Sequence, residues 1–539
     1  MTVDFDKIWS DIEENQIKSM TVSEFKNYIL AFLFYRYLSE SQENYLLTEQ
    51  VIDINDGQAV NDVYGDVAVG TDLADYLDDI SANLGYAIEP NDTWASLLSR
   101  IGDSSIIPSD YQKIFEHFNK NAQLNKEAAK NFQGIFDDIS LGDSRLGSDT
   151  NKRARSLNKI VKLVDSFNYG DNAGKLFGEL IERFAGSAGK TGGQFYTPHS
   201  VSELLAKIVT ADIEESDNVF SVYDPACGSG STLLSLKNQV PGGSRNGAIK
   251  YYGQEKELTT YNLARMNLLM NDISYKNIIL NNADSLALDW PDGPDAQGVD
   301  QMRVFDAVVS DIEFATSWDN SASRKKDPRF KGYEKLAPKG TADYAFILHS
   351  LYHLNDEGTM AMVLPHGVLF RGGVPGQSGA QAESFIRKNL INHPSGNKIY
   401  AVIGLPENIM FSEKGKKSVA VAIVVFKKKR DTDDILFIDA SNEFDKGKNK
   451  NFLSDKHIKK IMQAYTSRND APKYAHLATK YEIVLNEYNL NIPRYVSNVE
   501  EEAEIDLEVI NQLLDADDVE IAQVKAKVDE TLKVLGVRR

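Results

Sequence analysis

A glycine-rich turn between an apolar strand and a helix is the first feature with the composition of a ligand site. In VYDPACGSGSTLL, the strand-like run ends at Asp224, the turn holds Gly228 and Gly230, and Ser231 opens an apolar helical segment. Glycine lets the backbone approach a ligand closely, and a helix N-terminus offers N–H groups without intrahelical partners. The dinucleotide spacing G-x-G-x-x-G is absent. We predict a binding loop of another class, with a plain strand-to-helix turn as the alternative.

Two acidic residues stand at the ends of the next strand-like runs. Glu255 ends AIKYYGQE, and Asp284 follows NIILNNA. In a parallel sheet both would lie at the same edge as the glycine turn. We expect both carboxylates to accept hydrogen bonds from a bound ligand, because each buried donor needs an acceptor. The alternative is that either carboxylate is only solvated.

The stretch VSDIEFATSWD, residues 309–319, marks a further strand end, because it follows the apolar run VFDAVV. In an open α/β sheet, ligands bind beyond such ends. The stretch offers Asp311, Ile312, Glu313 and Phe314, a mixed set to which the residue types alone assign no reaction.

A parallel sheet is required to position these groups, and the second part of the sequence predicts one. Short β-rich runs appear after about residue 190, and helical segments lie between several of them. Strand, helix and strand at this spacing predict an α/β fold with a doubly wound, Rossmann-like parallel sheet. The runs are VFSVYD, AIKYYGQE, NIILNNAD, RVFDAVVSD, GTMAMVLP, IYAVIGLP and VAVAIVVFKK.

The flanking regions have a helical pattern. Residues 1–165 are predicted to form an all-α N-terminal domain, in which Ser23 caps a helix through EFKNYILAFLFYRYLSESQENYL. Residues 166–485 would hold the sheet and its chemistry. Residues 486–539 are predicted to form a charged helical tail, a docking helix or a solvated one rather than a catalytic element.

Composition narrows the class of protein. The net charge of −20 argues against a chain that coats nucleic acid unaided, because phosphate neutralisation needs a surplus of lysine and arginine. The single cysteine, Cys227, fits a reducing compartment, and no Cys/His cluster has zinc spacing, so we expect no metal site. No apolar run is long enough to span a membrane, and the acidic N-terminus is not a secretory signal, so we expect a cytoplasmic protein.

The motifs resemble, in order and over nearly the whole chain, those of methylation (M) subunits of type I restriction-modification systems. DPACGSG closely matches the first motif of amino-group DNA methyltransferases. The other matching stretches are FKNYILAFLFYRYLSE, FAGSAGKTGGQFYTP, DPRFKGYEKLAPKGTADYAFILHSLYHL, GTMAMVLPHGVLFRGG, VIGLPENIM and YNLNIPRYV.

This resemblance implies an S-adenosylmethionine-dependent methyltransferase domain that methylates N6 of adenine in double-stranded DNA, with the base flipped out of the duplex. It implies two copies bound to one specificity subunit, which reads the target, and a restriction subunit that can join them. The implied cofactor-binding residues are Gln194, Phe195, Tyr196, Thr197, Pro198, Asp224, Pro225, Ala226, Gly228, Ser229, Gly230, Ser231, Glu255 and Asp284.

The resemblance also places the stretch at 311–314 at the family's catalytic motif, Asn-Pro-Pro-Tyr/Phe. There an amide oxygen and a proline carbonyl accept the two N–H groups of the target amine, and the prolines hold the loop rigid. In this chain Asp311 still accepts, Ile312 lacks the fixed φ, and Glu313 brings a charge that is costly to bury unpaired. Phe314 keeps the aromatic ring that stacks on the base.

We therefore expect the fold and cofactor pocket to be intact and methyl transfer to be impaired. One alternative is a non-catalytic scaffold that binds cofactor and DNA. Another is methylation of cytosine N4, whose enzymes share the motif layout. Methylation of cytosine C5 is disfavoured because it needs a cysteine nucleophile, and the only cysteine lies in the cofactor loop. A protein or small-molecule methyltransferase would act without a specificity partner.

Cationic and aromatic residues near the predicted site are candidate DNA contacts. Trp318 is expected to line the base pocket or to pack its loop, and a lone histidine such as His366 is more often structural. The cations can meet phosphates or remain solvated. The candidates are Trp318, Lys325, Lys326, Arg329, Lys331, His366 and Arg371.

Overall fold

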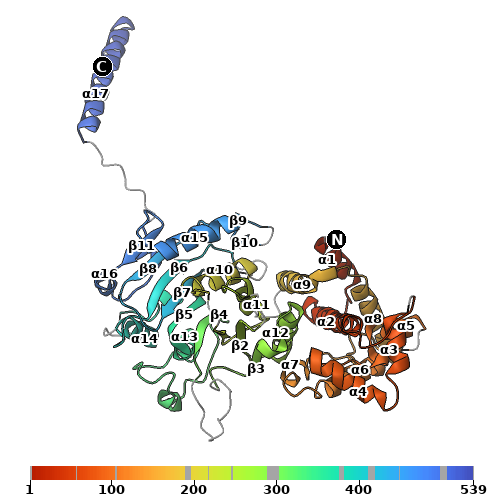
Figure 1. Cartoon of the computed structure of the whole chain (residues 1–539). Coiled ribbons are helices and arrows are strands. Elements are labelled where there is room, and N and C mark those ends of the chain that lie inside the picture. The colour runs from red at the N-terminus through yellow and green to blue at the C-terminus, as the bar shows by residue number, and fades with distance from the viewer. Residues whose placement is uncertain are drawn as a thin grey trace. The chain divides into compact units, whose positions relative to one another are not determined.

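The computed structural model describes most of the chain (Figure 1). It covers residues 3–55, 57–103, 106–187, 196–215, 218–243, 247–287, 303–374, 381–410, 419–447, 450–497 and 507–537. The chain divides into two compact units, one that extends to Val496 and one that begins at Ser497.

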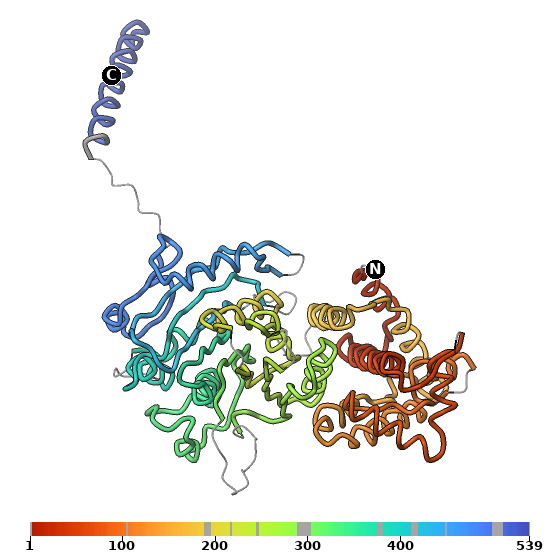
Figure 2. Tube along the Cα trace, viewed as in Figure 1, coloured from red at the N-terminus to blue at the C-terminus, as the bar shows by residue number. Residues whose placement is uncertain are grey.

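The described part of the first unit is built on a nine-stranded sheet with the order β11-β8-β6-β7-β5-β4-β1-β2-β3. The path of the chain through it can be followed in Figure 2. The strands are β1 (Phe220–Asp224), β2 (Ile249–Glu255), β3 (Ile278–Asn282), β4 (Phe305–Asp311), β5 (Leu354–Pro365), β6 (Ile399–Gly404), β7 (Val421–Lys427), β8 (Ile435–Asp439) and β11 (Ala475–Ala478). A separate pair is formed by β9 (Asp445–Lys446) and β10 (Asn451–Phe452). The doubly wound α/β fold is confirmed.

The sheet is mixed, which corrects the prediction of a parallel one. Strands β1 to β5 pair in parallel, as do β6 and β8, but β7 runs antiparallel to both of its neighbours, β5 and β6. Strand β11 is antiparallel to β8. Strands that follow each other directly can pair antiparallel without a crossover helix. The sequence carried this signal, because no helical pattern separates IYAVIGLP from VAVAIVVFKK.

Each face of the sheet carries its own hydrophobic core, because successive side chains of a strand point to opposite faces. In β5, Ala361 and Val363 belong to the first core, whereas Met360 and Met362 belong to the second. Helices α10 (His199–Val209), α11 (Ser231–Leu234), α12 (Leu258–Met270) and α15 (Asp455–Ser467) contribute to the first core. Helices α13 (Asp343–Tyr352), α14 (Ala382–Ile391) and α16 (Lys480–Leu485) contribute to the second. The sheet is therefore buried on both faces, and its strand ends remain the place for a ligand.

The N-terminal region is all helical in its described secondary structure, as predicted. It comprises α1 (Phe5–Asn15), α2 (Val22–Thr48), α3 (Val60–Val67), α4 (Asp72–Leu84), α5 (Trp94–Gly102), α6 (Pro108–Asn121), α7 (Ala129–Phe132) and α8 (Thr150–Asp165), and α9 (Ala173–Ser187) follows. Helix α2 is capped by Thr21 rather than by the expected Ser23. Thr21 Oγ1 accepts from the Glu24 N–H at 3.3 Å, and Thr21 N–H donates to Glu24 Oε2 at 2.8 Å. This reciprocal pair is a capping box, which Ser23 cannot form inside the first turn.

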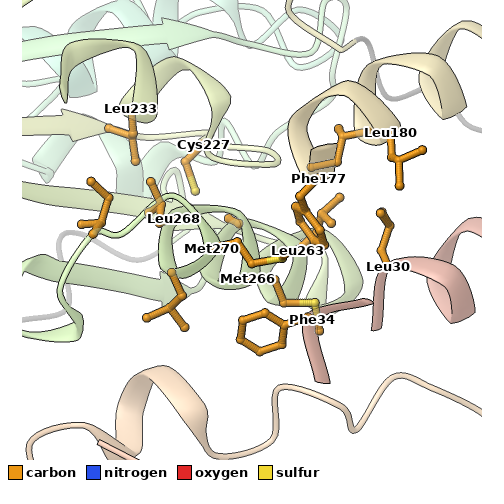
Figure 3. Close-up of a cluster of buried hydrophobic side chains, with 14 of the residues drawn as sticks. Leu30, Phe34, Phe177, Leu180, Cys227, Leu233, Leu263, Met266, Leu268 and Met270 are labelled. Atoms are coloured by element: carbon orange, nitrogen blue, oxygen red, sulfur yellow. The ribbon is translucent and has the colours of Figure 1, made fainter. Parts of the chain in front are cut away.

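Helices α2, α9 and α12 pack against one another and join the N-terminal region to the sheet (Figure 3). Figure 3 shows Leu30 and Phe34 of α2 beside Phe177 of α9 and Leu263 and Met266 of α12, all in the first core. This continuous core explains why residues up to Val496 form one compact unit rather than two.

The C-terminal unit contains α17 (Leu507–Val534), whose described side chains are nearly all exposed. The compact unit continues past the expected boundary after residue 485, since the Tyr495 ring stacks on Phe437 with centroids 3.9 Å apart. No described helix combines the length and the apolar character that a membrane crossing requires.

We predict that Gly253→Ala lowers the free energy of unfolding by about 1–3 kcal/mol, because an added Cβ overpacks the core. That atom would lie 2.8 Å from Leu280 Cδ2 and 3.0 Å from Cys227 Cβ, between β2, β3 and the glycine turn. Chemical denaturation of the full chain measures the change.

The matched control is Gly178→Ala in α9, where an added Cβ meets no atom within 4 Å. This variant should be more stable by roughly 0.5–1 kcal/mol, because alanine costs less entropy in a helix. Equal stability of the two variants would contradict the packing described at Gly253.

Candidate functional site

A cavity of about 310 Å³ opens at the carboxyl ends of β1, β2, β3 and β4. It brings together predicted residues that lie more than a hundred positions apart in the sequence. The predicted residues that line it are Tyr196, Thr197, Asp224, Pro225, Ala226, Gly228, Ser229, Ser231, Glu255, Asp284, Asp311, Glu313 and Trp318. Pro198, Gly230, Ile312 and Phe314 lie next to lining residues in the chain without lining the cavity, and Gln194 and Phe195 fall outside the described residues.

Asp224 anchors the glycine turn at the end of β1. Its side chain is 1% exposed, and Oδ1 accepts from the Ala226 N–H at 3.0 Å and from Ser310 Oγ at 2.8 Å. Burial raises the pKa of this carboxyl group to about 7. Gly228 and Gly230 have φ of +54° and +76°, a region that glycine enters at little cost. The turn therefore has its conformation because of one buried carboxyl group and two glycines.

Glu255 links the end of β2 to the same turn. Its Oε2 accepts from the Gly228 N–H at 3.1 Å, and its Oε1 accepts from the Glu257 N–H at 2.9 Å. Burial raises the pKa of Glu255. A carboxylate oxygen has two lone-pair sites, so both oxygens keep acceptor capacity for a ligand in the cavity.

Asp284 follows β3, the edge strand of the sheet, which is separated from β4 by β1 and β2. Its Oδ1 accepts from the N–H groups of Leu286 and Ala287 at 3.0 and 3.2 Å. Its Oδ2 lies 3.9 Å from Lys256 Nζ, in a partly exposed ion pair. This carboxylate is oriented by backbone donors, as a fixed acceptor must be.

Asp311, the last residue of β4, connects the opening stretch to the segment before α10. Its Oδ2 accepts from Thr197 Oγ1 at 2.6 Å. Its Oδ1 is buried and has no hydrogen-bond partner among the described residues. Burial raises the pKa of Asp311 to about 7. A buried acceptor without a partner is costly, and a ligand N–H in the cavity would remove that cost.

The three residues after Asp311 have different surroundings. Ile312 is 1% exposed in the second core, whereas Glu313 is exposed and lines the cavity. Phe314 is half-buried and packs against both cores. Ala315 has φ +57°, which turns the chain sharply there. The loop is thus held by apolar packing at Ile312 and Phe314 in place of prolines.

Two of the predicted DNA contacts have their charges paired within the fold, which leaves them less available to phosphates. Arg329 is 3% exposed, and its guanidinium donates to Asp327 Oδ2 and to the carbonyl oxygen of Ser285, each at 2.7 Å. Arg371 is paired with the buried carboxylates of Asp343 and Glu383. In the sequence these two arginines appear only as cations in loops. Asp343 and Glu383, which pair with Arg371, are distant from it in the chain. Asp327, which binds Arg329, looks like one more charged residue of the same loop.

The other candidates remain available to a ligand to different degrees. Lys325, Lys326 and Lys331 are exposed. His366 is half-buried, with Nε2 3.0 Å from the Val421 carbonyl oxygen, and burial lowers its pKa. Trp318 is 7% exposed, and its Nε1–H donates to the Pro338 carbonyl at 3.0 Å, so it forms a fixed wall of the cavity.

The N-terminal helices supply a wall that was not predicted. Ser23 and Lys26 of α2 line the cavity, as do Ile181, Phe184 and Ala185 of α9. The apolar stripe of α2 was interpreted as a packing face, which is correct for its buried residues. No motif marks Lys26, and the packing of α2 against α9 and α12 brings it to the site.

Family models match most of the chain. A model described as N-6 DNA Methylase matches residues 168–504, and one described as HsdM N-terminal domain matches residues 5–164. The chain belongs to the N-6 DNA methylase family. It is a methylase subunit of the type I restriction-modification kind, which confirms the resemblance found in the sequence.

Similar proteins match this methylase subunit over most of its length. The methylase subunit of the Mycoplasma pneumoniae type I restriction enzyme MpnII is 34% identical, with 94% of this chain and 92% of that protein covered. The MjaIX methylase subunit of Methanocaldococcus jannaschii is 29% identical, with 70% and 66% covered. The crystal structure of a type I restriction-modification methyltransferase subunit from Streptococcus thermophilus matches with a TM-score of 0.80 and 36% identity, with 92% and 99% covered.

The raised pKa of Asp311 predicts a pH dependence of stability. Its folded pKa of about 7 lies above the unfolded value of about 3.9, so the native state holds a proton that the unfolded state lacks between these pH values. Stability therefore falls as pH rises through this window. Between pH 5 and 7, the free energy of unfolding should decrease by roughly 1–3 kcal/mol more in the native sequence than in Asp311→Asn.

Denaturation curves at several pH values measure this difference. Because each protein is compared with itself at two pH values, any pH-independent effect of the substitution on stability cancels. Asp171→Asn, at an exposed position, is the control and should keep the pH dependence of the native sequence. Parallel curves for the native sequence and Asp311→Asn would show that Asp311 is not protonated in the fold.

Proposed function

We propose that this methylase subunit binds S-adenosylmethionine in the cavity and, in complex with a specificity subunit, transfers methyl groups slowly to N6 of adenine in double-stranded DNA. The observation that carries the proposal is the buried, unpartnered Oδ1 of Asp311 in the same cavity as the glycine turn. A flipped adenine brings an amino group that needs such an acceptor.

The residues of the cavity fit the cofactor by chemical type. Glu255 would accept from its ribose hydroxyls and Asp284 from its adenine amino group, while the turn at Gly228 lets the backbone approach. Tyr196, Thr197 and Trp318 would close the remaining walls. When bound, S-adenosylmethionine supplies a methyl group activated by its sulfonium.

Asp311 would orient the target amine by accepting one N–H at Oδ1, while Thr197 holds Oδ2. The carbonyl of Ile312 would accept the second N–H. Without prolines the loop is less rigid, and Glu313 brings an exposed carboxylate into the cavity where the family motif has a proline. Loss of one preorganised hydrogen-bonding group commonly costs about 10²–10³ in rate. A loop without prolines positions both acceptors less firmly, so we infer slow transfer.

We propose further that residues 1–165 act as a helical region and residues 166–485 as the catalytic region. The docking expected of residues 486–539 would then rest on the unit that begins at Ser497. Two copies of this chain would join one specificity subunit, and a restriction subunit would add to that core. The exposed apolar side chains of α17, such as Leu513 and Leu514, suit a helix that packs on a partner. Lys325, Lys326 and Lys331 would lie toward DNA phosphates.

A scaffold that binds cofactor and DNA without catalysis is the second candidate. It is favoured by the burial of Ile312 and by the exposed carboxylate of Glu313 in the cavity. In that case the catalytic loop would have become part of the core, and the chain would serve only to assemble the complex.

The decisive experiment compares the native sequence with the triple variant Asp311→Asn, Ile312→Pro and Glu313→Pro. Each is assembled with its specificity subunit and incubated with labelled S-adenosylmethionine and target DNA. We expect transfer by both, faster in the triple variant by about 10²–10³, because two prolines and the amide restore a preorganised loop.

Binding of the cofactor by both proteins, with transfer by the triple variant only, would support the scaffold. Transfer without the specificity subunit would contradict the proposed substrate. Digestion of the product DNA to nucleosides separates N6-methyladenine from N4-methylcytosine.

A further inference from the structure

The described lining of the cavity has more acidic than basic side chains, and a bound cofactor must be compatible with this excess of negative charge. Carboxylates dominate its described lining, which suits hydroxyl, amino and sulfonium groups. Its acidic members are Asp224, Glu255, Glu257, Asp284, Asp311 and Glu313. S-adenosylmethionine also has one anionic group, the carboxylate of its methionine part, and this group would be repelled by most of these walls.

Only two described lysines and no described arginine line the cavity, and they differ in their environment. Lys256 is 67% exposed in its side chain and pairs with Asp284. Lys26 is half-buried and forms no hydrogen bond or ion pair with any described residue. A cation held near low-dielectric walls without a contacting anion is unfavourable, because desolvation is not offset by a partner.

The packing of α2 fixes the position of Lys26. Leu30, one turn further along α2, lies in the first core beside α9 and α12 (Figure 3). Residues four apart share one face of a helix, so Lys26 projects from the side of α2 that contacts these helices. Burial lowers the pKa of its ammonium group, and the charge of Asp138 opposes this shift. Asp138 Oδ1 in turn accepts from Asn262 Nδ2 at 2.7 Å.

We infer that Lys26 of α2 binds the methionine carboxylate of S-adenosylmethionine, so that the N-terminal helical region forms part of the cofactor site. The inference rests on the proposed function of the cavity. Binding of the carboxylate supplies Lys26 with a contacting anion and gives the cofactor a cation in a largely acidic cavity. Such a charge-assisted hydrogen bond is among the stronger contacts available to a ligand.

The consequence is a coupling between two regions that the family models treat separately. Lys26 lies in the part matched by the N-terminal domain model, while the rest of the described cavity, apart from Ser23, lies in the part matched by the methylase model. Cofactor binding would therefore stabilise the contact of α2 with α9 and α12.

The test uses calorimetry on the full chain with two ligands, S-adenosylmethionine and its decarboxylated analogue, S-adenosyl-3-methylthiopropylamine. In Lys26→Met the affinity for S-adenosylmethionine should fall about 10- to 100-fold. The affinity for the decarboxylated analogue should change less than about 3-fold, because it has no carboxylate to lose. Lys26→Arg should keep most of the preference, since it retains the charge.

The control is Lys18→Met, which removes an exposed positive charge outside the cavity and should leave both affinities as they are. Equal weakening of both ligands in Lys26→Met would overturn the inference, because it would indicate a role in shaping the cavity. No weakening of either would also overturn it. If Lys26→Met does not fold, the native chain still decides: equal affinity for the two ligands would exclude any carboxylate contact.

Failure of the inference differs from failure of the proposed function. If the native chain binds neither ligand, the cavity is not a cofactor site and the proposed function fails. If the native chain binds S-adenosylmethionine but Lys26→Met does not selectively lose affinity for it, the proposed function stands and Lys26 has another role.

Discussion

The buried carboxyl group of Asp224 is the constraint on which the site depends. It accepts from the Ala226 N–H and from Ser310, and so fixes the start of the glycine turn against the neighbouring strand β4. Glu255 holds the same turn from β2 through Gly228. Three neighbouring strands of the sheet are thus joined at their ends by carboxyl groups. Their burial raises the pKa of each carboxyl group, a cost that is offset by hydrogen bonds and that leaves acceptors facing the cavity.

The N-terminal helices are part of this arrangement rather than an appendage. Helices α2 and α9 share a hydrophobic core with α12, and their side chains complete the cavity wall. A helical region that packs in this way can respond to the contents of the cavity, because any shift of α2 moves Lys26 together with Leu30. This packing gives a physical route by which the contacts of α2 and the contents of the cavity influence each other.

Much of the fold follows from local patterns. The apolar runs predicted strands β1 to β7, and the carboxylates at their ends were expected at one edge, where the structure has them. The direction of β7 was missed because the missing helical pattern before it, which allows antiparallel pairing with β6, was not used. The burial of Arg329 was missed because its hydrogen bonds to Ser285 and to the loop at Asp327 depend on tertiary packing. Lys26 was missed for the same reason, because a lysine in an otherwise apolar helix is normally expected on the side of the helix that faces solvent. The roles of individual site residues remain predictions.

The most direct test of the account is calorimetric titration of the full chain with S-adenosylmethionine, alongside Glu255→Ala. The account predicts saturable binding with one site per native chain and strong weakening in Glu255→Ala, which loses both a ribose acceptor and the partner of Gly228. Absence of binding to the native chain, alone and in complex with its specificity subunit, would contradict the central claim that carboxyl groups at these strand ends form a cofactor site.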